Sequence, residues 1–178
     1  MGVEVLSLNV EMARKKRRKA TDLKPTTGLV KNALFNILGD VSGLDFLDLF
    51  AGTGQIGLEA ERRGANVSFV ELHRKRAEDI KKKTKGKVYT GDVLRVLPKL
   101  KRFDIIFADP PYDYEKYKQL LKEVSQHLNE GGLLIVEHFK KVDLKPLTPS
   151  GLELEEERTY GDTVLSFFRK GQEEEGFF

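Results

Sequence analysis

The sequence predicts an α/β fold with a doubly wound, mostly parallel sheet of seven strands that ends in an antiparallel hairpin. Short apolar runs alternate with helical patterns along the chain, as expected for successive β-α-β units. The run at residues 103–108 is rich in aromatic and β-branched residues, which favours a parallel strand covered on both faces. Two further strands are expected at 152–157 and 163–169, and the Tyr-Gly-Asp between them is a hairpin signal.

Length and composition limit the class of protein. A chain of 178 residues forms one ordinary domain, and 39% hydrophobic with 33% charged residues describes a soluble globular protein. No apolar run approaches membrane-spanning length and no leader pattern opens the chain, so we expect a cytoplasmic protein without membrane contact. The absence of cysteine excludes disulfides and thiolate sites, and the three histidines lack metal-ligand spacing, so no metal is expected.

A small N-terminal extension precedes the main domain. Apolar residues between Val3 and Val10 predict a strand, and six consecutive basic residues follow at 14–19. A basic block of this kind is either a solvated linker or an arm that binds phosphates, because clustered Lys and Arg gain affinity by releasing condensed counterions. We therefore divide the chain into a strand and basic arm at 1–23, a main domain at 24–170, and a frayed tail at 171–178.

The main domain opens with a helix that Thr27 is suited to cap. Its apolar residues recur at helical spacing and form one stripe: Val30, Ala33, Leu34, Ile37 and Leu38. A strand at 45–50 then leads through a glycine-rich loop into a helix that ends near Arg63, with Gly64 as its C-cap.

The following elements continue the alternation. In chain order we expect a strand at 66–70, a helix at 73–85, a strand at 87–90, a short helix up to 98, the strand at 103–108, a helix at 114–128, a turn at 129–132 and a strand at 133–136.

The loop after the first strand fits two classes of ligand. Gly52, Gly54 and Gly57 have the spacing G-x-G-x-x-G between a strand and a helix, and Glu71 ends the next strand, which is the dinucleotide fingerprint. Asp48 argues against a dinucleotide, because a carboxylate that points into the site would repel a pyrophosphate.

Four consecutive strands carry an acid at or near their carboxyl ends, and this pattern favours a different ligand. The acids are Asp48, Glu71, Asp92 and Asp109. Any one of them could be a helix N-cap, but together they make a negative rim that suits a ligand with a cation and a ribose. S-adenosylmethionine, with its sulfonium, ammonium, ribose diol and adenine amine, is such a ligand.

The strand at 103–108 ends abruptly in Asp109-Pro110-Pro111-Tyr112. The two prolines forbid a helix and further ladder pairing, so the chain leaves the sheet in an extended conformation. A carboxylate, backbone carbonyls and an aromatic ring are thereby placed at the edge where α/β sheets bind ligands. For this motif alone, a stiff connection between strand and helix is an equally good interpretation.

Taken together, these motifs resemble those of a known class of enzymes. Residues 48–54 (Asp-Leu-Phe-Ala-Gly-Thr-Gly), Glu71, Asp92 and 109–112 resemble motifs I to IV of the class I S-adenosylmethionine-dependent methyltransferases, with motif IV in the form used for exocyclic base amines. Residues 24–27, 34–38 and 160–168 resemble one subfamily, the 16S rRNA (guanine-N2)-methyltransferases. The resemblance covers about residues 24–170. It departs at Lys24, where arginine is usual, and at the basic block, which replaces a glycine-containing hairpin.

The resemblance implies a Rossmann-like methyltransferase fold, S-adenosyl-L-methionine as cofactor, and methyl transfer to N2 of a specific guanine in 16S rRNA during small-subunit assembly. The implied partner is 16S rRNA or a partly assembled small subunit, and the implied state is a monomer. Expected cofactor-binding residues are Asp48, Phe50, Ala51, Gly52, Thr53, Gly54, Glu71, Leu72, Asp92, Val93 and Asp109. Expected catalytic residues are Asp109, Pro110, Pro111 and Tyr112. Thr27, Phe35 and Asn36 are expected at the pocket entrance.

Two other functions remain open from the sequence. DNA or RNA adenine-N6 methyltransferases share Asp-Pro-Pro-Tyr, although the DNA enzymes usually carry a separate target-recognition domain for which this chain has no room. A dehydrogenase or a non-catalytic nucleic-acid-binding module would leave residues 109–112 without a purpose.

Overall fold

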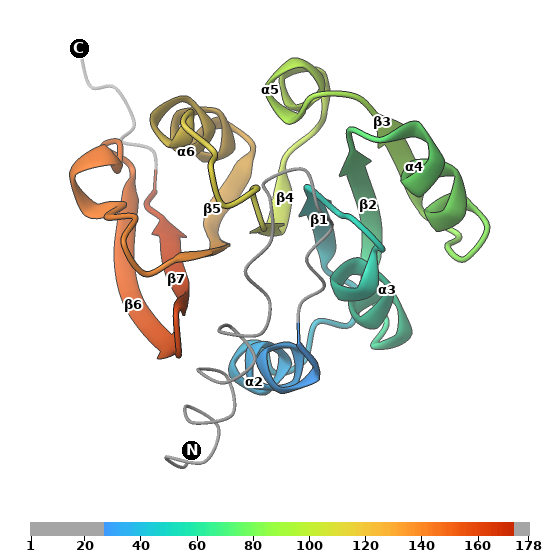
Figure 1. The fold of residues 1–178 in the computed structure, drawn as a ribbon, viewed down its shortest axis with the longest axis horizontal. Coiled ribbons are helices and arrows are strands. Elements are labelled where there is room, and N and C mark those ends of the chain that lie inside the picture. Colours follow the sequence, from blue (N-terminus) through green and yellow to red (C-terminus); the bar gives the residue numbers. More distant parts are fainter. Residues whose placement is uncertain (1–26, 173–178) are drawn as a thin grey trace.

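A computed structural model of the chain describes residues 27–172. The predicted strand at 3–10, the basic arm at 14–19 and most of the predicted tail lie outside these residues. The described part forms one seven-stranded sheet with helices on both faces (Figure 1). Within it, no helix combines the length and the apolar character that crossing a membrane requires.

The sheet confirms the predicted fold class. Its strands are β1 (Asp45–Leu49), β2 (Asn66–Glu71), β3 (Lys87–Thr90), β4 (Phe103–Ala108), β5 (Leu128–Phe139), β6 (Leu152–Tyr160) and β7 (Thr163–Lys170). The order across the sheet is β3-β2-β1-β4-β5-β7-β6. The first five strands are parallel, and β7 runs antiparallel to both of its neighbours. The C-terminal hairpin therefore joins the sheet through β7, which leaves β6 at the edge.

An apolar core lies on each face of the sheet, and each core is covered by its own layer of helices. Helices α2 (Gly28–Leu38) and α3 (Gln55–Arg62) cover one face, while α5 (Val93–Val96) and α6 (Tyr117–Gln126) cover the other (Figure 1). Ile80 of α4 (Arg74–Lys81) belongs to the core beneath α2 and α3. Alternate residues of each central strand enter the two cores, as a sheet covered on both faces requires.

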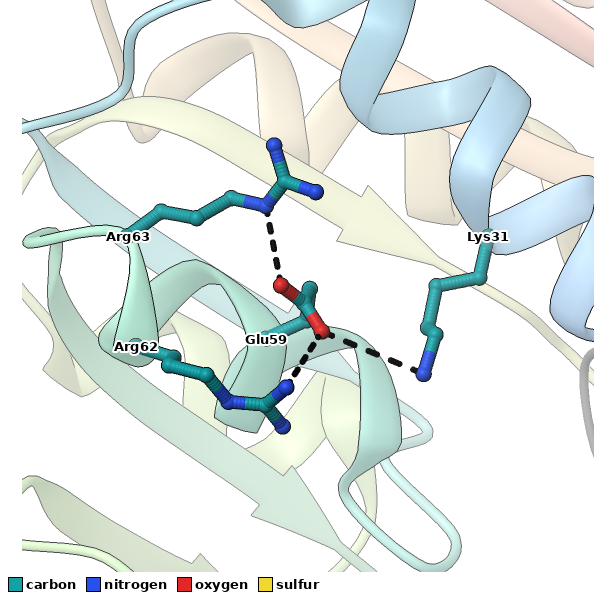
Figure 2. Close-up of polar contacts among 4 residues, drawn as sticks. All are labelled: Lys31, Glu59, Arg62 and Arg63. Carbon is teal, nitrogen blue, oxygen red and sulfur yellow. Dashed lines mark hydrogen bonds and ion pairs between the residues drawn. The ribbon is translucent and has the colours of Figure 1, made fainter.

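A buried acid links α2 and α3. Glu59 of α3 forms ion pairs with Arg62 at 3.1 Å, with Arg63 at 2.9 Å and, from α2, with Lys31 at 3.9 Å (Figure 2). The hydrogen bond from Arg63 is the main cause that holds the pKa of Glu59 below its usual value. The predicted N-cap of α2 is confirmed, because Thr27 Oγ1 accepts a hydrogen bond from Val30 N at 3.2 Å.

Several predicted boundaries are wrong, including the ends of β5 (Phe139 rather than 136) and β6 (Tyr160 rather than 157), and the structure gives the physical reason for three others. Helix α4 ends at Lys81 rather than 85, because Glu61 of α3 binds the Thr84 hydroxyl and the Lys85 amide. Helix α6 begins at Tyr117 rather than 114, because Tyr114 N closes a turn onto the Pro111 carbonyl.

The third difference is in β5, which already begins at Leu128. Pairing with β4 jumps from Phe103↔Leu128 to Ile105↔Leu133, so the predicted turn at 129–132 is a bulge within the strand. Two short 3-10 turns, Leu97–Lys99 and Lys145–Leu147, complete the described elements.

Candidate active site

The carboxyl ends of the parallel strands lie in register and bring the predicted acids to one edge. Leu49, Val70, Tyr89, Ala108 and Val136 form one row across five strands. Glu71 and Asp109 come one residue after this row, and Asp48 comes one residue before it. Because strand side chains alternate between faces, Asp48 and Glu71 share the face that α3 covers. The Asp48 side chain accepts a hydrogen bond from Gly57 N of that helix at 2.9 Å.

The predicted glycine loop connects β1 to α3 in a conformation that favours glycine. Gly52 has φ +62° and Gly54, the N-cap of α3, has φ +79°, which L side chains rarely adopt. Phe50 is the one described non-glycine residue with positive φ, at +56°. Gly57 is needed for another reason, since a Cβ there would overlap the Phe69 ring of β2. The loop therefore presents backbone rather than side chains beside the strand ends.

Glu71 is held by backbone amides on both of its carboxylate oxygens. Gly52 N donates to Oε1 at 2.7 Å and His73 N donates to Oε2 at 2.7 Å. This buried carboxylate therefore ties the glycine loop to the end of β2. A carboxylate has about four acceptor positions, so two hydrogen bonds leave capacity for a ligand's donors.

Asp48 is a buried acid next to another acid. It is 2% exposed, and burial, with a smaller contribution from the charge of Glu71, raises its pKa to about 8. The hydrogen bond from Gly57 acts in the opposite direction and is weaker. At neutral pH the carboxyl therefore holds a proton unless a cation lies beside it.

Asp92 has a structural role that the strand-end pattern does not reveal. It is the N-cap of α5, and its Oδ1 accepts a hydrogen bond from Leu94 N at 2.9 Å. Its side chain is exposed, and the neighbouring Val93 is buried in the core beneath α5.

The Asp-Pro-Pro-Tyr stretch leaves β4 beside β1, with Asp109 N 3.5 Å from the carbonyl of Leu49. Behind it, the Tyr114 ring meets Phe50 and Tyr117 edge to face, each at 5.2 Å between ring centroids. Burial raises the pKa of Tyr114 to about 12, and the charge of Asp92 adds to the shift. Burial also raises the pKa of Tyr117, and the charge of Asp109 makes a smaller contribution in the same direction. Contacts among the rings of Phe50, Tyr114 and Tyr117 therefore connect the glycine loop to the residues that follow β4.

The rim of this edge exposes two large hydrophobic side chains. Among the described residues, Leu72 (59% exposed) and Tyr112 (62% exposed) are the large hydrophobic side chains that face solvent. Leu72 follows the acid of β2, and Tyr112 follows the prolines after β4. Exposed apolar groups beside polar, buried acids are typical of a ligand site.

Two further observations concern residues outside the main motifs. Phe35 is 1% exposed and stacks on Phe46 in the core, so the expectation that it lines an entrance is wrong, whereas Asn36 of the same helix is exposed. Glu137 was not predicted; it is 1% exposed and follows Val136, the partner of Ala108, so it lies level with Asp109 on the neighbouring strand. The signal was present, because an acid ends the apolar run 133–136 as it ends the other strands.

No group of three or more His, Asp or Glu side chains within residues 27–172 is arranged to hold a metal ion. The polar chemistry of this edge comes from carboxylates and backbone amides.

Comparison with known proteins assigns the chain to a family. The family model described as "Conserved hypothetical protein 95" matches residues 9–169. A Bacillus subtilis protein named "Putative rRNA methyltransferase YlbH" is 35% identical over 165 residues, covering 84% of this chain and 89% of that protein. "Ribosomal RNA small subunit methyltransferase D" of Haemophilus influenzae is 32% identical over 155 residues, covering 78% of this chain and 79% of that protein.

A solved structure, a conserved hypothetical protein of Streptococcus pyogenes, superimposes with a TM-score of 0.71 at 28% identity, covering 79% of this chain and 94% of that one. The chain belongs to the family described as Conserved hypothetical protein 95.

Proposed function

We propose that this chain is an S-adenosylmethionine-dependent rRNA methyltransferase that methylates the exocyclic N2 amine of one guanine in 16S rRNA. One observation carries the proposal: the buried acids at the ends of β1 and β2 and the Asp-Pro-Pro-Tyr stretch after β4 share one sheet edge, whose rim exposes Leu72 and Tyr112. The names of the two relatives, both rRNA methyltransferases, support the substrate class.

The donor chemistry of the edge fits S-adenosylmethionine better than NAD. Glu71 offers a fixed, buried carboxylate for a ribose diol, and Asp48 offers one for an ammonium group. The loop at 51–54 gives backbone access to the methionine part, with Phe50 behind it. Leu72, Asp92 and Val93 are assigned to the adenine. A pyrophosphate would add two negative charges next to these acids, which is unfavourable.

The bound cofactor supplies an activated methyl group, and the chain's own residues prepare the acceptor. The lone pair of an exocyclic amine is delocalised into the base, so the amine is a poor nucleophile. The Asp109 carboxylate and the Pro110 carbonyl accept its two N–H groups, which fixes the nitrogen and favours a pyramidal geometry. Holding the two reacting atoms near attack distance contributes about 7–11 kcal/mol. Pro111 keeps the segment extended, and Asp109 or water accepts the proton afterwards.

The target base must leave its stack to reach Asp109, as in other enzymes that modify bases. Tyr112, exposed on the rim, is placed to stack on it, which contributes about 1–3 kcal/mol. Thr53 is exposed in the glycine loop, and we assign it to the cofactor.

Glu137 favours guanine over adenine as the target. Guanine presents N1–H and the N2 amine side by side, two adjacent donors, whereas adenine presents an acceptor at N1. Two carboxylates on neighbouring strands, Asp109 and Glu137, lie level with each other at this edge and offer acceptors rather than donors. Such an edge pairs with guanine and leaves adenine N1 without a donor.

Residues 27–172 form one sheet with its helices, and we propose that RNA shape rather than sequence supplies the specificity. We therefore propose a partly assembled small subunit as the natural substrate, a monomeric enzyme, and action in the cytoplasm. We also propose that residues 1–23 contact RNA as an extension of the 24–170 methyltransferase domain.

Mass spectrometry of rRNA nucleosides tests this function. The protein is incubated with labelled S-adenosylmethionine and, in parallel, with naked DNA, free 16S rRNA, and small subunits from cells that lack the modification. We expect N2-methylguanine, most in the subunits and little or no label in DNA. N6-methyladenine in DNA or RNA, with no N2-methylguanine in subunits, would establish the adenine alternative instead.

A further inference from the structure

One edge of the sheet carries a concentrated positive charge that the proposed catalytic site does not use. Residues 74–87 contain eight basic and two acidic residues, a net charge of +6, whereas the whole chain has +3. This segment comprises α4, the residues after it, and β3, the edge strand of the sheet. We call residues 81–87 the lysine loop; its five lysines are Lys81, Lys82, Lys83, Lys85 and Lys87, and all are exposed.

The positive charge of the loop is not neutralised by neighbouring acids. Arg74 pairs with Glu78 and Lys75 with Asp79, but within residues 27–172 the five loop lysines form no ion pair. The field of the loop reaches the nearest acid: the pKa of Asp79 is lowered mainly by its hydrogen bond from Lys75, and the charges of Lys82 and Lys83 add to the effect.

The backbone of the loop is fixed, unlike that of a solvated charge run. Glu61 of α3 accepts from the Thr84 hydroxyl at 2.9 Å and from the Lys85 amide at 3.2 Å. A Cβ at Gly86 would overlap the Val67 carbonyl of β2, so the loop packs closely on the sheet. The acid that could neutralise the lysines is thus engaged by backbone and hydroxyl groups. A surface ordered in advance loses less entropy when it binds.

The basic surface continues over the end of α3. Arg62 and Arg63 follow Glu61 directly, and with Lys31 they surround the single acid Glu59, which leaves two positive charges uncompensated (Figure 2). At its other end the surface reaches the proposed active site, because α4 begins at Arg74, three residues after Glu71. The eight residues of α4 span about 12 Å, a length over which a nucleic-acid strand presents several phosphates.

The opposite edge of the sheet has the opposite sign. β6 is the other edge strand, and it carries Glu153, Glu155, Glu156 and Glu157 against Arg158 alone. β3 and β6 lie at the two ends of the sheet (Figure 1). A protein with charges separated in this way meets a polyanion in one orientation, with the basic edge forward.

We infer that the basic surface formed by α4, the lysine loop and the end of α3 is a second RNA-docking surface, which binds the phosphate backbone of the RNA that flanks the target guanine. The inference rests on the proposed RNA substrate but not on methyl transfer. It is also separate from the basic arm at 14–19. Binding is through phosphates, so it orients the enzyme without reading sequence.

Two triple variants with the same change of charge test the surface. The first replaces Lys81, Lys82 and Lys83 with Gln. The matched control replaces three exposed lysines, Lys118, Lys122 and Lys145, on and next to α6, which covers the opposite face of the sheet. The affinity of each full-length protein for a 16S rRNA transcript is measured as a function of salt. Melting temperature and S-adenosylmethionine affinity are measured in parallel and should be unchanged.

We expect the loop variant to bind about tenfold more weakly near 0.1 M salt, with a salt slope lower by about 2–3, because each lost phosphate contact lowers the slope by about one. The control should stay within about twofold of the parent. If the two variants lose RNA affinity equally, net charge alone attracts the RNA and the inference is wrong. So would an unchanged RNA affinity combined with lost binding to phosphatidylserine vesicles, which would assign the surface to a membrane.

The nucleoside assay separates this inference from the proposed function. If the parent protein makes no N2-methylguanine but its RNA affinity depends on the lysine loop, the docking surface stands and the activity fails. If methylation proceeds and the loop variant binds RNA as the parent does, the surface alone fails.

Discussion

Replacing Asp48 with Asn should make the ligand-free protein more stable while weakening cofactor binding. Asn keeps the size of the side chain and an oxygen for the hydrogen bond from Gly57, so the substitution removes mainly the titratable charge. The pKa of Asp48 is about 8 in the folded protein and near 3.8 when the chain is unfolded, where burial is lost. Between these values the folded protein holds a proton that the unfolded chain has released.

The sign and size of the effect follow from this difference. Because the folded state binds more protons, stability falls as pH rises from about 4 to about 8 and is flat above that range. Asp48 therefore lowers the free energy of unfolding by at most about 4 kcal/mol at pH 7 and about 6 kcal/mol above pH 8. These are upper limits, because local relaxation and water entry lower the cost of a buried charge. Asn does not titrate, so the stabilisation should grow with pH.

Urea unfolding, followed by circular dichroism without cofactor at pH 5, 7 and 8.5, measures this effect. The variant should be more stable than the parent by at least about 1 kcal/mol at pH 8.5 and nearly equal to it at pH 5. Calorimetry in two buffers should show that the parent releases a proton when it binds S-adenosylmethionine near pH 7, and that the variant binds weakly without release. A variant that is less stable than the parent at pH 8.5, or whose stability advantage does not change with pH, would refute the reasoning.

Four further predictions use the same protein. Calorimetry should show binding of S-adenosylmethionine and S-adenosylhomocysteine but not of NAD. Glu71→Ala should weaken binding of S-adenosylmethionine by about tenfold or more, as expected when a charged hydrogen bond is lost. A comparable affinity for NAD would contradict the proposed cofactor. Asp109→Ala should abolish label transfer to rRNA with cofactor affinity nearly unchanged, and near-normal turnover would rule out its role in orienting the amine. Replacing the basic residues at 14–19 with Ser should lower RNA affinity and its salt slope, whereas an unchanged slope would identify a solvated linker. Gly57→Ala should cost about 1–3 kcal/mol in urea unfolding, because its Cβ overlaps Phe69; Gly28→Ala, with open space around it, is the control and should be neutral.

The sequence predicted the strands well because their signals are local. Each apolar run is short, and an acid or glycine marks its end, so the register of the strand ends and the loop at 52–57 followed from the pattern. The structure adds that Gly52 and Gly54 of this loop have the positive φ that the turn requires. The helix ends were less accurate, because they depend on contacts between segments distant in sequence, such as that of Glu61 with the residues after α4.

Side-chain burial was the part that the pattern could not supply. Phe35 lies outside the predicted apolar stripe, as an entrance residue would, but stacking on Phe46 places it in the core. Asp92 ends a strand as the other acids do, yet its carboxylate caps α5. Glu137 follows the predicted strand 133–136 as Asp109 follows 103–108, but only the structure shows that this acid is buried beside β4 and β7.

The position of β7 determines when the chain can finish folding. β7 is the last strand of the described residues in chain order, but it lies between β5 and β6. Until β7 has left the translating ribosome, β5 lacks a partner on one side and β6 lacks the strand with which it pairs in the described sheet. Unpaired strands of this kind are sites of misassembly. The four glutamates of β6 repel a second copy of the same nascent strand, which protects the chain until β7 emerges and closes the sheet.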